Sequence, residues 1–152
     1  MAVTSLTKNK KAFADYEILE TFEAGIQLLG PEVKSIRARN INLKGSFVDI
    51  DSQGEVWANE IHISPYKFAR DQNLAPTRKR KLLLRQKEID KILKVLNEQG
   101  VTCVPLEVYL KGGLIKMKIG LVKGKKKYDR RAELKKRSQN LEVARALKKR
   151  VQ

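Results

Sequence analysis

Few residues of this 152-residue chain have the chemistry of catalysis. The single histidine, His62, falls at the end of an expected strand without an evident partner, which is typical of a hydrogen-bonded structural residue. Cys103 lies in the apolar run VTCVP and is expected to fill the core. Asp49 and Asp51 share a strand face, but neither a third metal ligand nor a glycine-rich phosphate loop is evident. We therefore expect no enzyme, no metal and no cofactor; an RNA-cleaving enzyme, the alternative, would depend on His62.

Positive charge is the chemistry that the chain carries in excess. Lys and Arg number 33 against 17 acidic residues, a net charge of +16. A solvated surface would explain one basic cluster, but repetition along the chain predicts a polyanionic partner, namely a nucleic acid. Charge does not distinguish DNA from RNA, and the scarcity of aromatic residues favours recognition of shape over recognition of bases. The clusters in the body are Lys10 and Lys11, Arg37 and Arg39, TRKRK at 77–81, and Lys116 and Lys118.

The densest charge lies at the C-terminal end. From Lys123 onward, thirteen Lys and Arg stand against three acidic residues. The segment has good helix formers but too few apolar residues to fold alone, so it is expected to order only on a countercharged partner. We therefore predict a folded body over 1–122 and a basic tail over 123–152, which is disordered when free.

Alternating apolar residues in the body predict a mainly β fold. We expect a small antiparallel barrel of the oligonucleotide-binding type with two or three helices, and a two-layer α+β sandwich is the alternative. Gly25 is expected to allow a bulge between two strands, and Gly100 to cap a helix. The expected elements are a mobile segment over 1–11, strands within 15–30, a helix over 31–39, a hairpin over 46–63, a loop over 64–77, a helix over 85–99 and a hairpin over 101–122.

Several other classes of protein are excluded by composition. One cysteine permits no internal disulfide, which suits a reducing compartment. No stretch of about 18 apolar residues could cross a bilayer, and the N-terminal letters MAVTSLTKNKKAFADY lack the apolar run of a secretory signal. We expect a cytoplasmic protein that does not bind membranes.

Several long strings carry a resemblance to a known family. They are NKKAFADYEILETFEAGIQLLGPEVKSIRA, HISPY, RKLLL and GLVKGKKKYDRR, in an order and spacing that resemble the SsrA-binding protein family, small protein B, from about residue 9 to the end. The resemblance implies a six-stranded barrel with flanking helices and a tail that is unfolded in solution. Members bind the tRNA-like domain of transfer-messenger RNA (tmRNA) and carry it, charged with alanine, into stalled ribosomes for trans-translation.

The resemblance also implies roles for particular residues. Glu23, Leu83 and Lys116 match family positions that contact the tRNA-like domain. Glu23 would accept from a ribose hydroxyl or base donor and Lys116 would meet phosphate. Leu83 would pack on an unstacked base or sugar, with packing in the core as the alternative. Further contacts with this RNA are expected from Asn9, Lys10, Lys11, Arg37, Arg80 and Lys81.

The tail is implied to enter the empty messenger channel of the ribosome and to become helical there. It would replace codon–anticodon pairing at the decoding centre, where Tyr128 could stack on a base and Asp129 could accept from a base edge. The expected ribosome contacts are Gly124, Lys125, Lys126, Lys127, Tyr128, Asp129, Arg130, Arg131, Lys135 and Lys136.

The chain departs from the family pattern at a few positions. Phe13 and Ala14 stand where Arg-His is usual, and Ala75 stands where an aspartate is common, which leaves the contacts of 67–77 open. The implied partners are tmRNA and small-subunit rRNA, with alanyl-tRNA synthetase and elongation factor Tu reached through the RNA complex, and the protein is expected to be a monomer. A ribosomal or ribosome-assembly protein that binds rRNA is the alternative, because it would share the same charge.

Overall fold

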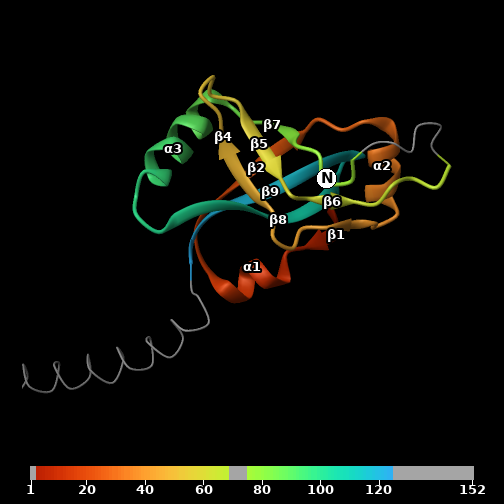
Figure 1. The fold of residues 1–152 in the computed structure, drawn as a ribbon, viewed down its shortest axis with the longest axis horizontal. Helices are drawn as coiled ribbons and strands as arrows, with labels where there is room; N and C mark the ends of the chain where they lie inside the picture. The colour runs from red at the N-terminus through yellow and green to blue at the C-terminus, as the bar shows by residue number, and fades with distance from the viewer. Residues whose placement is uncertain (1–2, 69–74, 125–152) are drawn as a thin grey trace, which may run out of the picture.

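Long antiparallel strands form most of the protein (Figure 1). The computed structural model describes residues 3–68 and 75–124. Seven strands hydrogen-bond in the order β1-β8-β4-β5-β7-β2-β9, and β9 also pairs with β8, so the sheet closes partly into a ring of six strands with β1 added at the outside of β8. The strands are β1 (Val3–Lys8), β2 (Tyr16–Ile26), β4 (Phe47–Ile50), β5 (Val56–Asn59), β7 (Arg80–Leu83), β8 (Val101–Lys111) and β9 (Leu114–Gly124).

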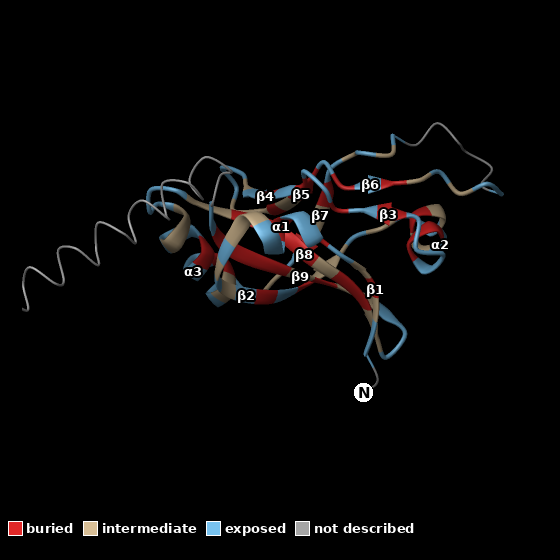
Figure 2. Ribbon diagram, turned by 90° about the horizontal axis from the view of Figure 1, so that it is seen from below, coloured by how far each residue is buried: buried red, intermediate tan, exposed pale blue. Residues whose placement is uncertain are grey.

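Shorter elements cover the ring. A small pair of strands, β3 (Ile41–Asn42) and β6 (His62–Ile63), is separate from the main sheet. Helix α1 (Lys10–Asp15) packs on β8, α2 (Gly30–Arg37) lies at one end of the molecule, and α3 (Gln86–Leu96) lies at the other (Figures 1 and 2). This confirms the predicted antiparallel barrel rather than the two-layer sandwich, and of the two or three helices expected the described residues form three.

The core lies inside the ring, along the inward faces of β8 and β9 (Figure 2). Alternation along β9 buries Met117 and Ile119, and α3 adds Ile89 and Ile92, which share one helical face. A second, smaller cluster forms where Ala12 of α1 covers Val104, Leu106 and Val122 on the outer side of the sheet. The burial of these apolar side chains, at about 25 cal/mol per Å² of apolar surface, fixes the positions of the strands that carry the site.

The structure corrects the sequence interpretation at three places. The first residues were expected to be mobile, but Val3–Lys8 is strand β1, because Leu6 is buried and the segment pairs with β8. The region around Gly25 is one continuous strand, and its bulge lies between Ile18 and Glu20. Gly100 does not cap α3: that helix ends at Leu96, and Gly100, with a φ of +80°, forms the turn into β8.

The hairpins over 46–63 and 101–122 and the helix that begins near Pro31 are confirmed, and the described residues of 64–77 contain no helix or strand. Strand β9 continues to Gly124, which pairs with Tyr16, so the sheet includes the first two residues of the predicted tail. The other tail residues lie outside the described part of the chain. In residues 3–68 and 75–124, the helices all lack the length and apolar character needed to span a bilayer.

Candidate nucleic-acid interface

A hollow of about 670 Å³ opens on the outer surface where β9, β2 and β7 lie side by side. Gly25 of β2 pairs on one side with Lys116 of β9 and on the other with Leu83 of β7. Glu23, two residues earlier on β2, points to the same outer face, because side chains alternate along a strand. The β2–β7 hollow is lined by Glu23, Gly25, Leu83, Leu84, Arg85, Lys87, Glu88 and Lys116.

The apolar part of this hollow is Leu83. Its neighbour Leu82 is 2% exposed and belongs to the core, whereas Leu83 is 49% exposed on the outer face. A Cβ atom at Gly25 would lie 3.3 Å from Cβ of Leu83, so the missing side chain lets Leu83 lie close over β2. The structure therefore decides between the two readings of Leu83: its side chain is at the surface and not in the core.

The acidic part of the hollow is Glu23, which is fixed by residues of β8. The Tyr109 hydroxyl donates to Oε2 of Glu23 at 2.5 Å, and Nζ of Lys111 lies 3.3 Å from both carboxylate oxygens. The hydrogen bond from Tyr109, with the charges of Lys111 and Lys116, holds the pKa of Glu23 below its ordinary value. Burial and the bond to Glu23 raise the pKa of Tyr109 in turn. Glu23 therefore presents an ionised carboxylate, which can only accept hydrogen bonds.

The basic residues near the N-terminus form a separate site. A second hollow, of about 450 Å³, is lined by Lys8, Asn9, Lys10, Lys11, Asn42 and Lys44. We call it the lysine hollow. The predicted contacts Lys10 and Lys11 therefore do not join Glu23, Leu83 and Lys116.

Asn9 does not present its amide to solvent, contrary to the expected RNA contact. Its side chain is buried; Nδ2 donates to the carbonyl oxygens of Leu43 and Pro105 at 3.2 and 2.9 Å, and Oδ1 accepts from the Ala12 amide at 3.1 Å. Both Nδ2 and Oδ1 of the Asn9 side chain are therefore hydrogen-bonded to groups of the protein itself. Asn9 is the N-cap of α1 and holds this helix, with its two lysines, on the sheet.

Arg80 was also expected to contact RNA, but the structure places its side chain inside the protein and not at the surface. The side chain is fully buried; Nε donates to Glu32 at 2.8 Å and Nη2 donates to the Pro76 carbonyl at 2.8 Å. Arg78 also donates to Glu32. Burial would raise the pKa of Glu32, but the hydrogen bonds from Arg78, the Leu29 amide and Arg80 hold it below its ordinary value. Side chains alternate along β7, so Arg80 and Leu82 point inward. The basic run TRKRK is therefore not exposed along its whole length.

The remaining predicted contacts of the body are at the surface. Lys81 points outward from β7, with Nζ 3.1 Å from the Glu55 carboxylate. Arg37 is exposed near the end of α2 and donates to the Gly113 carbonyl at 3.2 Å. Gly124 is exposed at the end of β9. The predicted contacts from Lys125 to Lys136 lie outside the described residues.

The candidate catalytic residues do not converge. His62 is exposed on β6, and Cys103 is fully buried, which raises the pKa of its thiol to about 12. Asp49 accepts from the Asn59 side chain at 2.9 Å, and Asp51 accepts from the Trp57 indole at 2.9 Å. Over residues 3–68 and 75–124, His, Cys, Asp and Glu form no group of three that could hold a metal ion.

Sequence reasoning missed the residues that orient Glu23. Tyr109 and Lys111 lie two residues apart on β8 and so share one side of that strand, and Tyr109 pairs across the hairpin with Lys116. The glycine turn, which sets the register of this hairpin, could have placed them beside Lys116. Their contact with Glu23, 86 residues away in the chain, depends on β2 pairing with β9, which local patterns do not reveal.

The fold and the hollow define a class of protein, a small antiparallel barrel with an ionised carboxylate, an exposed leucine and lysines on its outer sheet. The chain belongs to the SmpB protein family, whose model matches residues 6–149. The family binds RNA.

Curated relatives named SsrA-binding protein match almost the whole chain. Those of Bacillus cytotoxicus and Streptococcus mutans are each 50% identical, over 95% and 94% of this chain and 93% and 92% of their own lengths. The relative in Lactococcus lactis is 51% identical over 94% of this chain and 92% of its own. A solved chain described as "tmRNA-SmpB: a journey to the center of the bacterial ribosome" has a TM-score of 0.67 and 43% identity, over 80% of this chain and 85% of that one.

Proposed function

We propose that this protein binds the tRNA-like domain of tmRNA and delivers it to stalled ribosomes for trans-translation. The relatives named SsrA-binding protein and the solved tmRNA-SmpB chain support the choice of RNA. The observation that carries the proposal is the convergence of Glu23, Leu83 and Lys116, from three strands, in one hollow.

The chemistry of the hollow suits an unpaired nucleotide. Leu83 offers an apolar platform for a base or sugar, Glu23 accepts from a base N–H or a ribose hydroxyl, and Lys116 meets a phosphate. The lysine hollow would bind the RNA backbone through Lys10 and Lys11, without reading bases.

The basic tail would act in the ribosome. We propose that residues from Gly124 to Lys136 enter the empty messenger channel and take the place of codon–anticodon pairing, which makes recognition depend on absent messenger. The protein would work as a monomer in the cytoplasm and would meet alanyl-tRNA synthetase and elongation factor Tu through the RNA.

Binding to RNA tests the first part of this proposal. The full chain should bind the tRNA-like domain with a Kd of about 10⁻⁸ M or tighter, the range of specific protein–DNA complexes, and bulk rRNA more weakly. Glu23→Gln and Lys116→Ala should weaken this binding, whereas Lys91→Ala on α3, whose amine pairs with Glu20, should not. Equal affinity for rRNA and tmRNA would indicate a ribosomal or assembly protein instead.

Peptide tagging on stalled ribosomes tests the second part. Asp129→Ala with Arg131→Ala should leave the affinity for tmRNA unchanged while tagging falls. Equal loss of both would count against separate roles for the body and the tail.

A further inference from the structure

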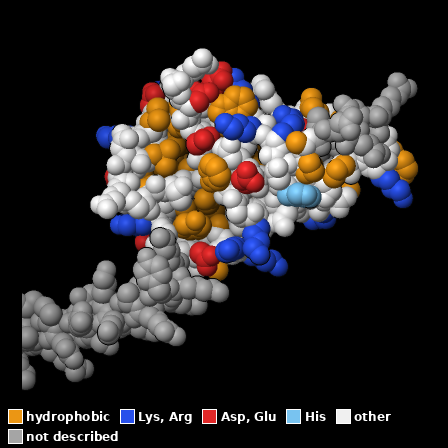
Figure 3. Space-filling model, viewed as in Figure 1, with side chains coloured by type: hydrophobic (Ala, Val, Ile, Leu, Met, Phe, Trp, Pro, Cys, Tyr) orange, Lys and Arg blue, Asp and Glu red, His pale blue; other side chains and the backbone are white. Residues whose placement is uncertain are grey.

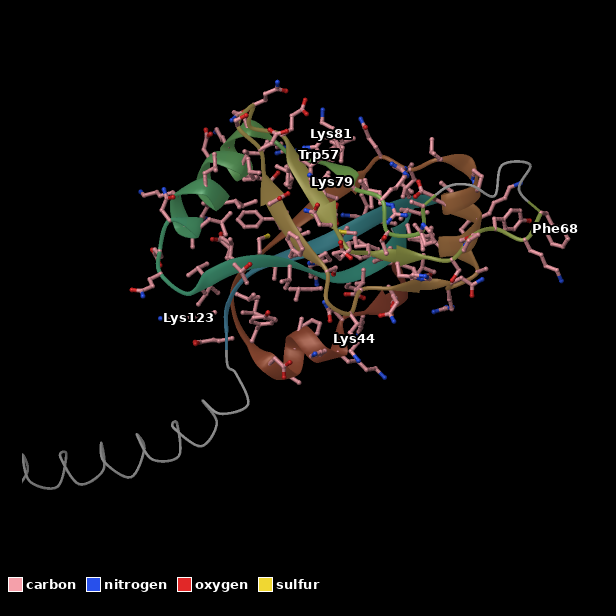
Figure 4. All side chains as sticks on the ribbon, viewed as in Figure 1. Lys44, Trp57, Phe68, Lys79, Lys81 and Lys123 are labelled. Carbon is pink, nitrogen blue, oxygen red and sulfur yellow. The ribbon has the colours of Figure 1, made fainter. Side chains whose placement is uncertain are left out.

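The outer face of the sheet continues from the β2–β7 hollow onto β7 and β5. Lys81 lies two residues before Leu83 on β7, and it pairs with Trp57 of β5. Leu82, between the two, is buried, so Leu83, Lys81 and Trp57 share the outer face. Figure 4 shows Trp57 together with Lys79 and Lys81 over these strands.

The orientation of the Trp57 ring is fixed at its polar edge. Its Nε1 donates to Oδ2 of Asp51 at 2.9 Å, and Oδ1 of Asp51 accepts from the amides of Gln53 and Glu55 at 3.0 and 2.9 Å. The only polar group of the indole is therefore bonded within the protein. What the half-buried side chain can offer a ligand is its π face, whereas a tryptophan in a small domain is more often placed in the core.

Basic and acidic side chains lie on opposite sides of the Trp57 indole. Lys79 and Lys81 lie on the β7 side, and Asp49 and Asp51 lie on the β4 side. Lys81 also neutralises Glu55, with 3.1 Å between Nζ and the carboxylate. Figure 3 shows basic, acidic and apolar side chains next to one another on this face. A polyanion can therefore approach from β7, where the hollow lies, but is repelled at β4.

We propose that Trp57, Lys79 and Lys81 form a second nucleotide subsite, next to the β2–β7 hollow. An unpaired nucleotide of the bound RNA stacks its base on the indole, and its phosphate lies on the two lysines of the β7 side. This subsite rests on the proposed function, because the same tRNA-like domain would occupy both places. It gives the protein a contact that tolerates any base, since every base has a π face.

Fluorescence tests the subsite directly, because Trp57 is the only tryptophan of the chain. Addition of the transcribed tRNA-like domain to the full-length protein should quench its emission with the same Kd as a filter-binding assay. Trp57→Leu should weaken binding by roughly 5- to 150-fold, the range that base–aromatic stacking covers, whereas Trp57→Phe should retain most of the affinity. Phe47→Ala, which removes an exposed aromatic ring from β4, is the matched control and should not change the Kd.

Lysine variants give a second measurement that leaves the Trp57 side chain unchanged. Lys79→Gln together with Lys81→Gln should reduce the slope of log K against log salt by about 0.7 for each single-strand phosphate released. Unchanged emission, or equal Kd values for Trp57→Leu and wild type, would overturn the subsite, even if the wild type binds tmRNA tightly. Loss of affinity in Trp57→Leu and Trp57→Phe alike would also overturn it, because stacking does not predict that result. Failure of the wild type to bind tmRNA would refute the proposed function itself.

Discussion

Removal of the Glu32 carboxylate should destabilise the body far more than removal of a surface acid. Glu32 is 3% exposed and Arg80 is fully buried. In Glu32→Ala, the Arg80 guanidinium would keep carbonyl partners at Ile61 and Pro76 but lose its only countercharge among the described residues. Loss of one partner of a buried pair costs about 3–5 kcal/mol, and the loss of the bond from the Leu29 amide at the start of α2 adds about 1 kcal/mol.

Urea unfolding measures this cost. A domain of this size has a free energy of unfolding of about 5–15 kcal/mol, so Glu32→Ala would remove a large part of it and lower the midpoint clearly. The matched control is Glu55→Ala, which breaks the half-exposed pair with Lys81 and should cost about 0–1 kcal/mol. If the two variants unfolded at the same urea concentration, the inward role of Arg80 would be wrong.

Three further predictions concern the hollow and α1. Tyr109→Phe removes the hydroxyl that holds Glu23 and should weaken tmRNA binding up to about tenfold. Because the pKa of Glu23 is lowered in the folded protein, RNA binding that needs its carboxylate should persist in mild acid and fail as the pH falls through that pKa. In Tyr109→Phe the pH at which binding fails should be higher. A titration of Kd against pH that gave the same result for both proteins would contradict the role of Tyr109. Gly25→Ala should displace Leu83 and weaken RNA binding, with little change in the melting temperature, since its new Cβ would meet Leu83 at 3.3 Å; equal Kd values would show that Leu83 is not a contact. Asn9→Ala should destabilise the protein by about 2–3 kcal/mol, through a lost helix cap and lost buried hydrogen bonds, and an unchanged denaturation curve would return Asn9 to the list of RNA contacts.

Period-two patterns predicted the hairpins well, because each strand buries alternate residues against one core. The run VTCVPLEVYL followed by a glycine turn is sufficient for β8 and β9. The same rule, applied to RKLLL, would have placed Arg80 and Leu82 inside and Leu83 outside. The burial of Arg80 was not predicted, because every residue of the basic cluster was expected to be exposed.

The strand at the N-terminus and the contacts of Glu23 could not be predicted from the residues next to them in the sequence. Val3–Lys8 is polar apart from Val3 and Leu6, and it becomes a strand because β8 offers it an open edge. Asn9 similarly has its partners 34 and 96 residues away. Such long-range pairings come from the closure of the ring of strands, and a single sequence contains no signal for them.

Strand β9 carries residues of both proposed contacts, the one with tmRNA and the one with the ribosome. It carries Lys116 near its start and leaves the sheet at Gly124, and it is hydrogen-bonded on both sides, to β8 and to β2. Eight residues at about 3.3 Å each set roughly 26 Å between the two points. The distance between the proposed RNA contact at Lys116 and the start of the proposed ribosome contacts at Gly124 is therefore set by the length of one strand.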